Sequence, residues 1–589
     1  LLSQPSFQAA TLAGDVALTR QDQGALVSNF DLQAGSVQAA GVAASSLRLE
    51  GRIRSRQDLS HVAFDGSMEG EGIRPGQGPD NQLAEWQRAA GDTIAEPLLA
   101  RLRQGLRAEG AQSEFSAEIQ ARRSDGRTTI IIPQARWRGT SGQTILALSR
   151  GQYAFGGPEP ASIAGNFSTG GNGIPRITGR MEGQNGAART MRLTMADYAA
   201  GDARLAVPDM RISQTAGGAI ALSGRVLASG AFPGGTVRGL DLPVSGRWNA
   251  KSGLALGNRC ITPRFERMTI ASLTLAGQAI TLCPPRGGAI VQNGAGGLKI
   301  AAGVPELELT GELGQTPIRI DGGPVGVAFP GVLVARDMAV ELGEGGSSTR
   351  FLLSGLKAEL GPDIRGSFDD LEMRMAAVPL DITRASGDWA YRDGALTLSD
   401  ASIRVTDREA SARFNPMVAE GASLRLADNR IEADAVLREE QSGRHVVDAA
   451  IIHNLGTGTG HADLSVPGLT FDKGLQPTDV TPLALGVVAN AAGIVEGTGR
   501  IDWSGQGVTS TGQFTTDALD FAAAFGPVRG LAGTVRFTDL LGLVTAPNQQ
   551  ITVAEVNPGI PVESGVIRYA LEPGKVFAFQ SGKWPFLGG

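Results

Sequence analysis

The stretch Leu47-Arg48-Leu49-Glu50-Gly51-Arg52-Ile53-Arg54 decides the fold of this chain. Its odd-numbered positions are apolar or Gly, and its even-numbered positions are charged. Successive side chains of a β-strand point to opposite faces, so the stretch predicts a strand with one apolar face and one polar face. Its Gly-Arg-apolar phrase recurs in other alternating segments, at residues 51–53, 179–181, 224–226, 246–248 and 499–501. The sequence therefore predicts a long series of similar antiparallel strands.

Composition agrees with many short strands joined by turns. Gly accounts for 82 of the 589 residues, roughly twice its usual share, and is scattered with Asp, Asn and Ser between apolar runs. The net charge is -6 with both signs interspersed, and the missing basic stripe argues against nucleic-acid binding. The sequence has no apolar run of about 18 residues. It opens at Leu1 without Met and stops in mid-pattern, so we expect a piece of a larger protein.

One long amphipathic helix is predicted, from about Asn81 to Ala108. Pro97 is expected to kink it, and Gly110 to end it. Its apolar residues recur three and four positions apart, which places them on one stripe: Leu83, Trp86, Ala90, Ile94, Leu98, Leu102 and Leu106. Packing of this stripe on the sheet is the simplest expectation, and a mobile lid or a membrane-surface helix is the alternative. A second, short helix is expected near residues 482–494.

The predicted helices are too few to cover so much one-sided sheet, so the apolar face must fold toward itself. The fold class expected is therefore mainly β: an elongated, curved antiparallel sheet that forms an apolar groove. At about one strand per 13 residues and about 4.8 Å per strand, it would hold on the order of 40 strands over roughly 190 Å.

Alternation assigns particular side chains to the apolar face of this groove. The residues expected there, as sites of contact with an apolar ligand, are Leu47, Leu49, Ile53, Leu222, Val226, Leu307, Leu309, Leu371, Met373, Leu531, Val535, Phe537, Ile551, Val553, Ile567, Tyr569 and Leu571. Four segments are expected along the chain: the groove start at 1–75, a helical insertion at 76–110, a repetitive body at 111–480, and a short helix with a further groove segment at 481–589.

No complete catalytic motif is present, and the sequence indicates neither an enzyme nor a cofactor. The glycine-rich pieces at 294–297 and 456–460 resemble nucleotide-binding loops only in composition and are explained as hairpin turns. His453 and His461 flank the second of these turns and could face each other across a hairpin. A metal pair there lacks further strong ligands, since structural zinc usually takes four, so ordinary strand histidines are the simpler interpretation.

The two cysteines, Cys260 and Cys283, bracket the alternating segment 268–275. Two lone cysteines around one short β segment suit a disulfide in an oxidising compartment. Two unpaired thiols are the alternative.

Several short segments carry a family resemblance. They are QQITV at 549–553, NPGIPV at 557–562, GVI at 565–567, WPFLGG at 584–589, the 482–502 segment with GTGRIDW at 497–503, and LCP at 282–284 with its cysteine pair. Together they resemble the AsmA-like intermembrane bridge proteins, most closely the YdbH type, which share a TamB-like architecture. The specific match covers roughly the last hundred residues and the cysteine segment, and elsewhere only the β repetition agrees.

The resemblance implies a periplasmic protein that conducts phospholipids between the inner and outer membranes, with acyl chains in the groove and head groups in water. It also implies an inner-membrane anchor through an N-terminal helix that this sequence lacks, and a small outer-membrane lipoprotein partner at the C-terminal end. Two other interpretations compete. A structural or adhesin-like extracellular β-repeat protein would have shorter and stricter repeats, and a polysaccharide-acting β-helix enzyme would have more than 5% aromatic residues.

Overall fold

The computed structural model describes residues 7–585 except 22–24, 40–41, 59, 125, 157–160, 184–188, 216–217, 295, 344–347, 361–362, 375–378, 455 and 575. Within these residues, 38 strands belong to one antiparallel hydrogen-bonded sheet. The chain divides into two compact units: unit 1 (Leu1–Ile270, Ala276–Ala302) and unit 2 (Ala271–Leu275, Gly303–Gly589). The prediction of a mainly β chain with one antiparallel sheet is confirmed.

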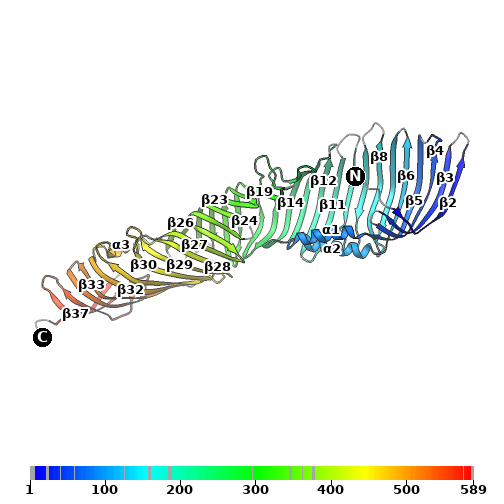
Figure 1. The fold of residues 1–589 in the computed structure, drawn as a ribbon. Helices are drawn as coiled ribbons and strands as arrows, with labels where there is room; N and C mark the ends of the chain where they lie inside the picture. The colour runs from blue at the N-terminus through cyan, green and yellow to red at the C-terminus, as the bar shows by residue number, and fades with distance from the viewer. Residues whose placement is uncertain are drawn as a thin grey trace. The chain divides into compact units, whose positions relative to one another are not determined.

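Unit 1 pairs its strands in chain order from β2 to β14 (Figure 1). Its strands are β1 (Phe7–Gln8), β2 (Thr11–Arg20), β3 (Leu26–Ala39), β4 (Val42–Ser55), β5 (His61–Pro75), β6 (Ser113–Ser124), β7 (Arg127–Arg138), β8 (Thr144–Gly156), β9 (Ser162–Thr169), β10 (Ile177–Glu182), β11 (Arg189–Ala200), β12 (Ala203–Gln214), β13 (Ile220–Phe232), β14 (Gly235–Asn249), β15 (Gly253–Leu256), β16 (Arg264–Ile270) and β18 (Val291–Gly294). Residues of β17 (Leu273–Ala279) and β19 (Gly297–Val304) belong to both units.

Unit 2 continues the same antiparallel pattern. Its strands are β20 (Leu307–Leu313), β21 (Thr316–Gly322), β22 (Val325–Phe329), β23 (Gly331–Leu342), β24 (Thr349–Leu360), β25 (Ile364–Arg374), β26 (Leu380–Arg392), β27 (Ala395–Asp407), β28 (Met417–Ala427), β29 (Arg430–Glu439), β30 (His445–Asn454), β31 (Thr459–Phe471), β32 (Ala489–Ser504), β33 (Gly507–Ala523), β34 (Gly526–Asp539), β35 (Val544–Thr545), β36 (Gln549–Val556), β37 (Val562–Glu572) and β38 (Val576–Lys583).

The predicted long helix is wrong: the structure has two shorter helices, α1 (Gln77–Ala90) and α2 (Ala95–Glu109). Gly91 leaves the helical conformation with φ 49° and ψ -138°, which ends α1. Pro97 lies in the first turn of α2, where a missing N–H costs no helical hydrogen bond, so it does not kink a helix. The prediction that Gly110 ends the helix is confirmed, because its N–H caps the Leu106 carbonyl at 2.9 Å.

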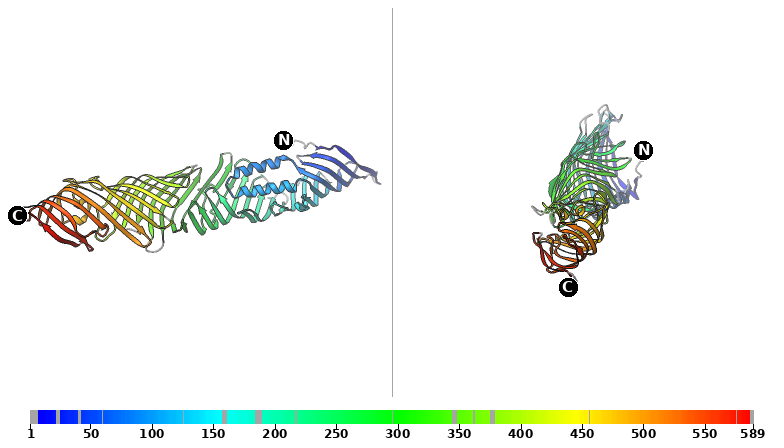
Figure 2. Two further views of the ribbon diagram at one scale, coloured as in Figure 1. Left: turned by 90° about the horizontal axis from the view of Figure 1, so that it is seen from below. Right: turned by 90° about the vertical axis from the view of Figure 1, so that its left-hand side faces the viewer.

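The two helices run side by side across the strands of unit 1 (Figure 2). Leu98 of α2 packs with Tyr198 and Ala203 in a buried apolar cluster, so α2 covers the β11–β12 turn. Asp80 of α1 accepts hydrogen bonds from Arg103 and Arg107 of α2 over 2.6 to 3.1 Å. These guanidinium groups hold the pKa of Asp80 well below its usual range.

The short helix expected near 482–494 is displaced toward the N-terminus. The structure has one helical turn at α3 (Pro477–Val480) and a 3-10 turn at η3 (Pro482–Ala484), and strand begins again at Ala489. Residues 472–488, which we call the strap, bond to the preceding β27–β28 loop. The Asn415 amide Nδ2 donates to the Thr478 and Asp479 carbonyls at 2.8 and 2.9 Å.

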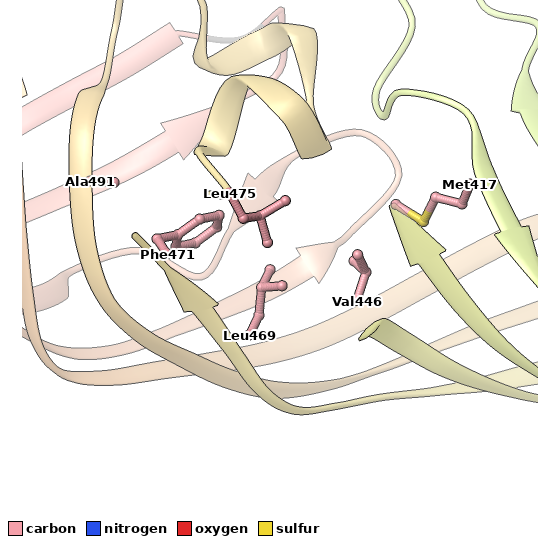
Figure 3. Close-up of a cluster of buried hydrophobic side chains, with 6 residues drawn as sticks. All are labelled: Met417, Val446, Leu469, Phe471, Leu475 and Ala491. Carbon is pink, nitrogen blue, oxygen red and sulfur yellow. The ribbon is translucent and has the colours of Figure 1, made fainter. Parts of the chain in front are cut away.

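The strap covers an apolar cluster in unit 2 (Figure 3). Leu475 is fully buried there against Leu469, Phe471 and Val446, with Met417 and Ala491 alongside. Near the N-terminal end of the strap, Gln476 exchanges two hydrogen bonds with the backbone of Ala491 in β32, at 2.8 and 3.0 Å. The strap therefore covers part of the sheet and is hydrogen-bonded, through residues 476–479, to the β27–β28 loop and to β32.

Many strands carry a bulge that strict alternation did not predict. A residue with positive φ stands inside the strand, as at Gly239 (63°), Asp370 (51°), Asp400 (52°) and Gly530 (59°). In β27, Leu398 belongs to the sheltered face before Asp400, and Ala401 belongs to it afterwards. A bulge adds one residue, so the inward-facing positions switch between even and odd numbers, and the strand bends and twists.

Candidate functional site

The hydrogen-bond register of unit 1 aligns an unbroken row of apolar or Gly residues, because directly opposed residues of antiparallel strands share a face. This unit-1 apolar row takes one residue from every strand from β2 to β14. It comprises Gly14, Leu32, Leu49, Met68, Ala117, Ala135, Leu148, Phe167, Gly179, Leu193, Met210, Gly224 and Val244. At about 4.8 Å per strand, its twelve spacings cover about 58 Å measured along the row.

Unit 2 has a row of the same kind, from β22 to β33. The unit-2 apolar row comprises Val327, Leu333, Ala358, Gly366, Trp389, Leu398, Leu424, Ala433, Ile451, Ala462, Ile501 and Ser510. Its one polar member, Ser510, donates a hydrogen bond of 2.7 Å to Asp539. Each unit therefore presents an apolar strip that crosses its strands.

The opposite face of unit 1 is polar at the neighbouring register positions, with Ala147 as the one exception. From β3 to β11 the row beside the apolar one comprises Gln33, Arg48, Glu69, Ser116, Arg136, Ala147, Ser168, Thr178 and Thr194. Arg48 bonds Asp31 there at 2.6 and 3.0 Å, and this contact lowers the pKa of Asp31. The two faces thus differ in chemistry along the whole run.

Two glycines on the apolar face of unit 1 make room for rings from neighbouring strands. A Cβ on Gly51 would lie 2.8 Å from the Phe64 ring and 3.0 Å from the Phe30 ring, and these two rings stack at 6.0 Å. A Cβ on Gly179 would overlap the Phe167 ring. In two copies of the recurring Gly-Arg phrase, Gly therefore lies beneath an aromatic ring on the apolar side. The Arg that follows Gly is exposed in four of the five copies, and Arg52 is partly buried.

The predicted groove residues all lie in strands, and none is fully exposed. Leu309, Val553 and Tyr569 are buried, and the other predicted positions are partly exposed: Leu47, Leu49, Ile53, Leu222, Val226, Leu307, Leu371, Met373, Leu531, Val535, Phe537, Ile551, Ile567 and Leu571. Partial exposure follows from a sheet whose apolar side chains are only locally covered by helices.

The register brings several predicted residues together within each unit. Leu49 pairs with Leu32 and Met68, and Ile551 pairs with Ile567. Met373 pairs with Phe351 and Ile382, and Val535 pairs with Phe514. Sequence analysis missed the aromatic members of the rows, Phe167 and Trp389. An aromatic residue one strand away from a Gly in an apolar position is the signal that could have found Phe167.

The histidines do not form a metal pair. His453 pairs with Gly460, and His461 pairs with Ile452, so their rings point to opposite faces. His453 lies on the apolar side, where Trp503 donates a 3.1 Å hydrogen bond to it and burial lowers its pKa. In the part of the chain that the structure describes, no group of three or more His, Cys, Asp or Glu side chains could hold a metal ion.

A shallow hollow of about 940 Å³ lies over β29 to β34 in unit 2. Its lining mixes charged residues such as Asp434, Asp463 and Arg500 with apolar ones such as Leu464 and Phe537. Its central cation, Arg500, is already bound by Asp463 at 2.8 Å and Asp502 at 3.0 Å. Arg500 is therefore already paired and is not a free cation for a ligand.

Cys260 and Cys283 form a disulfide, as predicted. Beside it, Ile261 and Leu282 exchange two backbone hydrogen bonds of 2.8 Å. The bond thus closes the base of the loop that contains β16 and β17.

A model of the YdbH-like family, described as intermembrane phospholipid transport protein YdbH, matches residues 2–589. The chain belongs to the YdbH-like family. The resemblance in the last hundred residues therefore extends over almost the whole chain; residues 586–589 of WPFLGG lie outside the described structure. Direct comparison with individual curated proteins gives no match. Of the helices in the described ranges, none combines the length and apolarity needed to cross a membrane.

Proposed function

We propose that this YdbH-like protein conducts phospholipids between the inner and outer membranes along the apolar face of its sheet, without catalysis. Acyl chains lie on the apolar rows while head groups stay in water. The observation that carries the proposal is the two apolar rows, one in each unit, with Ser510 at the end of the second as their one polar member. In unit 1 the opposite face of the strands is polar. Family membership supports a phospholipid as the cargo.

The size of the rows favours a path over a single binding site. A bilayer's hydrocarbon core is about 30 Å thick, so one acyl chain reaches about 15 Å, or roughly three strand spacings. The unit-1 apolar row is about four times that length. Each CH₂ group transferred from water to the apolar face lowers the free energy by about 0.8 kcal/mol. Because neighbouring strands are similar, they bind an acyl chain with similar free energy, and no single position along the row holds it much more tightly than the next.

The finer features are part of the same proposal. The groove would be built by 1–75, 111–480 and 481–589, with the helical insertion at 76–110. The protein would act in the periplasm, held in the inner membrane by an N-terminal helix of the parent protein and met at its C-terminal end by a small outer-membrane lipoprotein. These features are supported by the family likeness and by the disulfide, which suits an oxidising compartment.

Photo-crosslinking tests the proposal directly. A photoreactive residue at Leu49, Met373 or Val535 should capture phospholipid in cells, as identified by mass spectrometry. The adjacent positions Arg48, Glu372 and Arg536 lie on the opposite face of the same strands and serve as matched controls. Equal capture from both sets would refute the assignment of lipid to the apolar face and would favour a structural scaffold.

A further inference from the structure

Three neighbouring turns at one end of the unit-2 strands carry no charged residue, although 19% of the whole chain is charged. They are residues 482–488 (PLALGVV), 521–528 (FAAAFGPV) and 556–562 (VNPGIPV), which we call the apolar rim. Other loops at the same end of the strands are charged, as in REASARFNP at 408–416 and EQSGR at 440–444. Among the loops compared at this end of the strands, charged residues are therefore absent only from these three turns.

The three turns lie next to one another in the structure. Ala489, just after the first turn, pairs with Ala522 of the second. The Asn557 N–H of the third turn donates to the Pro527 carbonyl of the second at 3.0 Å. These contacts make the rim one continuous surface.

Each turn of the rim exposes a large apolar side chain to solvent. Leu485 is 77% exposed, Phe525 59% and Ile560 71%, and Val487 adds a further 59%. Single exposed apolar side chains are ordinary, but four on adjacent turns without a charge between them mark an interaction surface.

The apolar rim is continuous with the apolar interior of unit 2. Val488 and Phe521 pack against the cluster beneath the strap. Phe521 and Ala523 pack against a second buried cluster of Val528, Val553 and Val556. An acyl chain that crosses the rim would meet no charged side chain of these turns before it reached these clusters.

We infer that the apolar rim inserts into the surface of a phospholipid bilayer and is a place where acyl chains pass between that bilayer and the apolar face. This inference rests on the proposed function. The rim offers turns and not a strand edge, so a partner could not add a strand to it. A protein interface usually has a polar rim, often with Arg, whereas this surface is uncharged throughout, as insertion among acyl chains requires.

Vesicle flotation tests the inference with the whole chain and zwitterionic vesicles of phosphatidylethanolamine and phosphatidylcholine. The chain should float with the vesicles, and the triple variant Leu485→Asp/Phe525→Asp/Ile560→Asp should bind at least tenfold less. The matched control is Val332→Asp/Val334→Asp/Leu352→Asp on the opposite face of unit 2, where these side chains are 39%, 36% and 38% exposed and pair with Glu359, Lys357 and Glu372. The control should retain binding, and thermal unfolding should confirm that both variants fold.

Two results would overturn the inference. One is an equal loss of vesicle binding in the rim and control variants, which would indicate nonspecific hydrophobic adsorption. The other is a chain that does not bind vesicles and either stays monomeric or self-associates through the rim. Lipid capture at Leu49 separates the two ideas: capture by a chain that does not bind vesicles would reject the rim and keep the conducting face. Absence of capture with rim-dependent vesicle binding would reject conduction instead.

Discussion

The indole Nε1–H of Trp503 donates a 3.1 Å hydrogen bond to Nδ1 of His453, across the β31 strand that separates them. Gly460 lies between the two and makes room for the indole, since a Cβ there would come within 2.6 Å of the ring. Because an indole N–H can only donate, Nδ1 of His453 must be the acceptor and the imidazole must be neutral. A neutral, satisfied polar pair thus lies within an otherwise apolar face.

This pair predicts a loss of stability on mild acidification. Burial lowers the pKa of His453 below its usual value, so the unfolded chain binds a proton more readily than the folded one. The contribution of neutral His453 to the free energy of unfolding should be fully present above pH 6.5, the ordinary pKa of histidine. It should be lost as the pH drops through the lowered pKa of the folded state. Protonation also removes the acceptor for Trp503, a bond worth about 1 kcal/mol. Urea unfolding at pH 7.5 and pH 5 measures the effect.

The control for this prediction is His453→Gln, which cannot titrate. Its unfolding midpoint should change less between the two pH values than that of the parent chain. An unchanged pH dependence in the variant would show that other groups are responsible.

A second prediction concerns Gly179 in the unit-1 apolar row. Gly179→Ala should destabilise the protein by about 1 to 3 kcal/mol, because the new methyl group overlaps the Phe167 ring and forces it to move. Chemical denaturation gives the size of the effect. Gly326→Ala is the matched control, since a Cβ there meets nothing within 4 Å.

The same site offers a rescue experiment. In a Phe167→Leu background, Gly179→Ala should cost clearly less than in the parent chain, because the ring that it displaces is gone. A cost that stays the same in both backgrounds would mean that the ring contact is not the cause.

A third prediction concerns the disulfide. Free-thiol labelling of the denatured, unreduced protein should find neither Cys260 nor Cys283 reactive. The double variant Cys260→Ser/Cys283→Ser should lose roughly 3 kcal/mol, the chain-entropy expectation for a separation of 23 residues. Two labelled thiols before reduction would contradict the bond.

The sequence predicted the strands well because alternation is a local property, visible within one strand. The disulfide was predictable as well, since only one pairing of Cys260 with Cys283 exists. The bulges were not, because Asp400 adopts a positive φ that an Asp seldom requires, and the apolar positions change parity there. The break between α1 and α2 was misplaced at Pro97 because the helix-ending conformation of Gly91 outweighs the continuing apolar stripe.

The sequence predicted the type of site, an apolar face of a sheet, but not which residues of neighbouring strands lie side by side in it. A single strand identifies its own apolar face, as in Leu49, but not which residue of the next strand lies beside it. The neighbours Leu32 and Met68 follow only from the register, which turns and bulges set. Buried clusters depend on distant segments as well: Leu475 lies in a strap that no alternating pattern predicts.

The last prediction concerns conduction itself. Val535 is partly exposed on the apolar face, opposite Phe514, so an Asp there could reach water and leave the fold intact. Leu309 is a poorer position, because at 9% exposure a new carboxylate would be buried. A charge that faces hydrocarbon costs several kcal/mol unless it is paired, so Val535→Asp should obstruct passing acyl chains. In the full-length parent protein, in cells that lack redundant bridges, it should weaken the envelope barrier at least tenfold, measured as detergent sensitivity.

The matched control is Arg536→Asp, one residue away on the polar face, where its guanidinium contacts Gln513 at 3.1 Å. It adds the same carboxylate to the same strand, and the envelope should remain intact because acyl chains do not touch that side. Protein levels measured by immunoblot exclude degradation as the cause of a defect. A normal envelope with Val535→Asp at normal levels would contradict conduction along this face. A defect shared by both variants would point to the strand's structure and away from lipid contact.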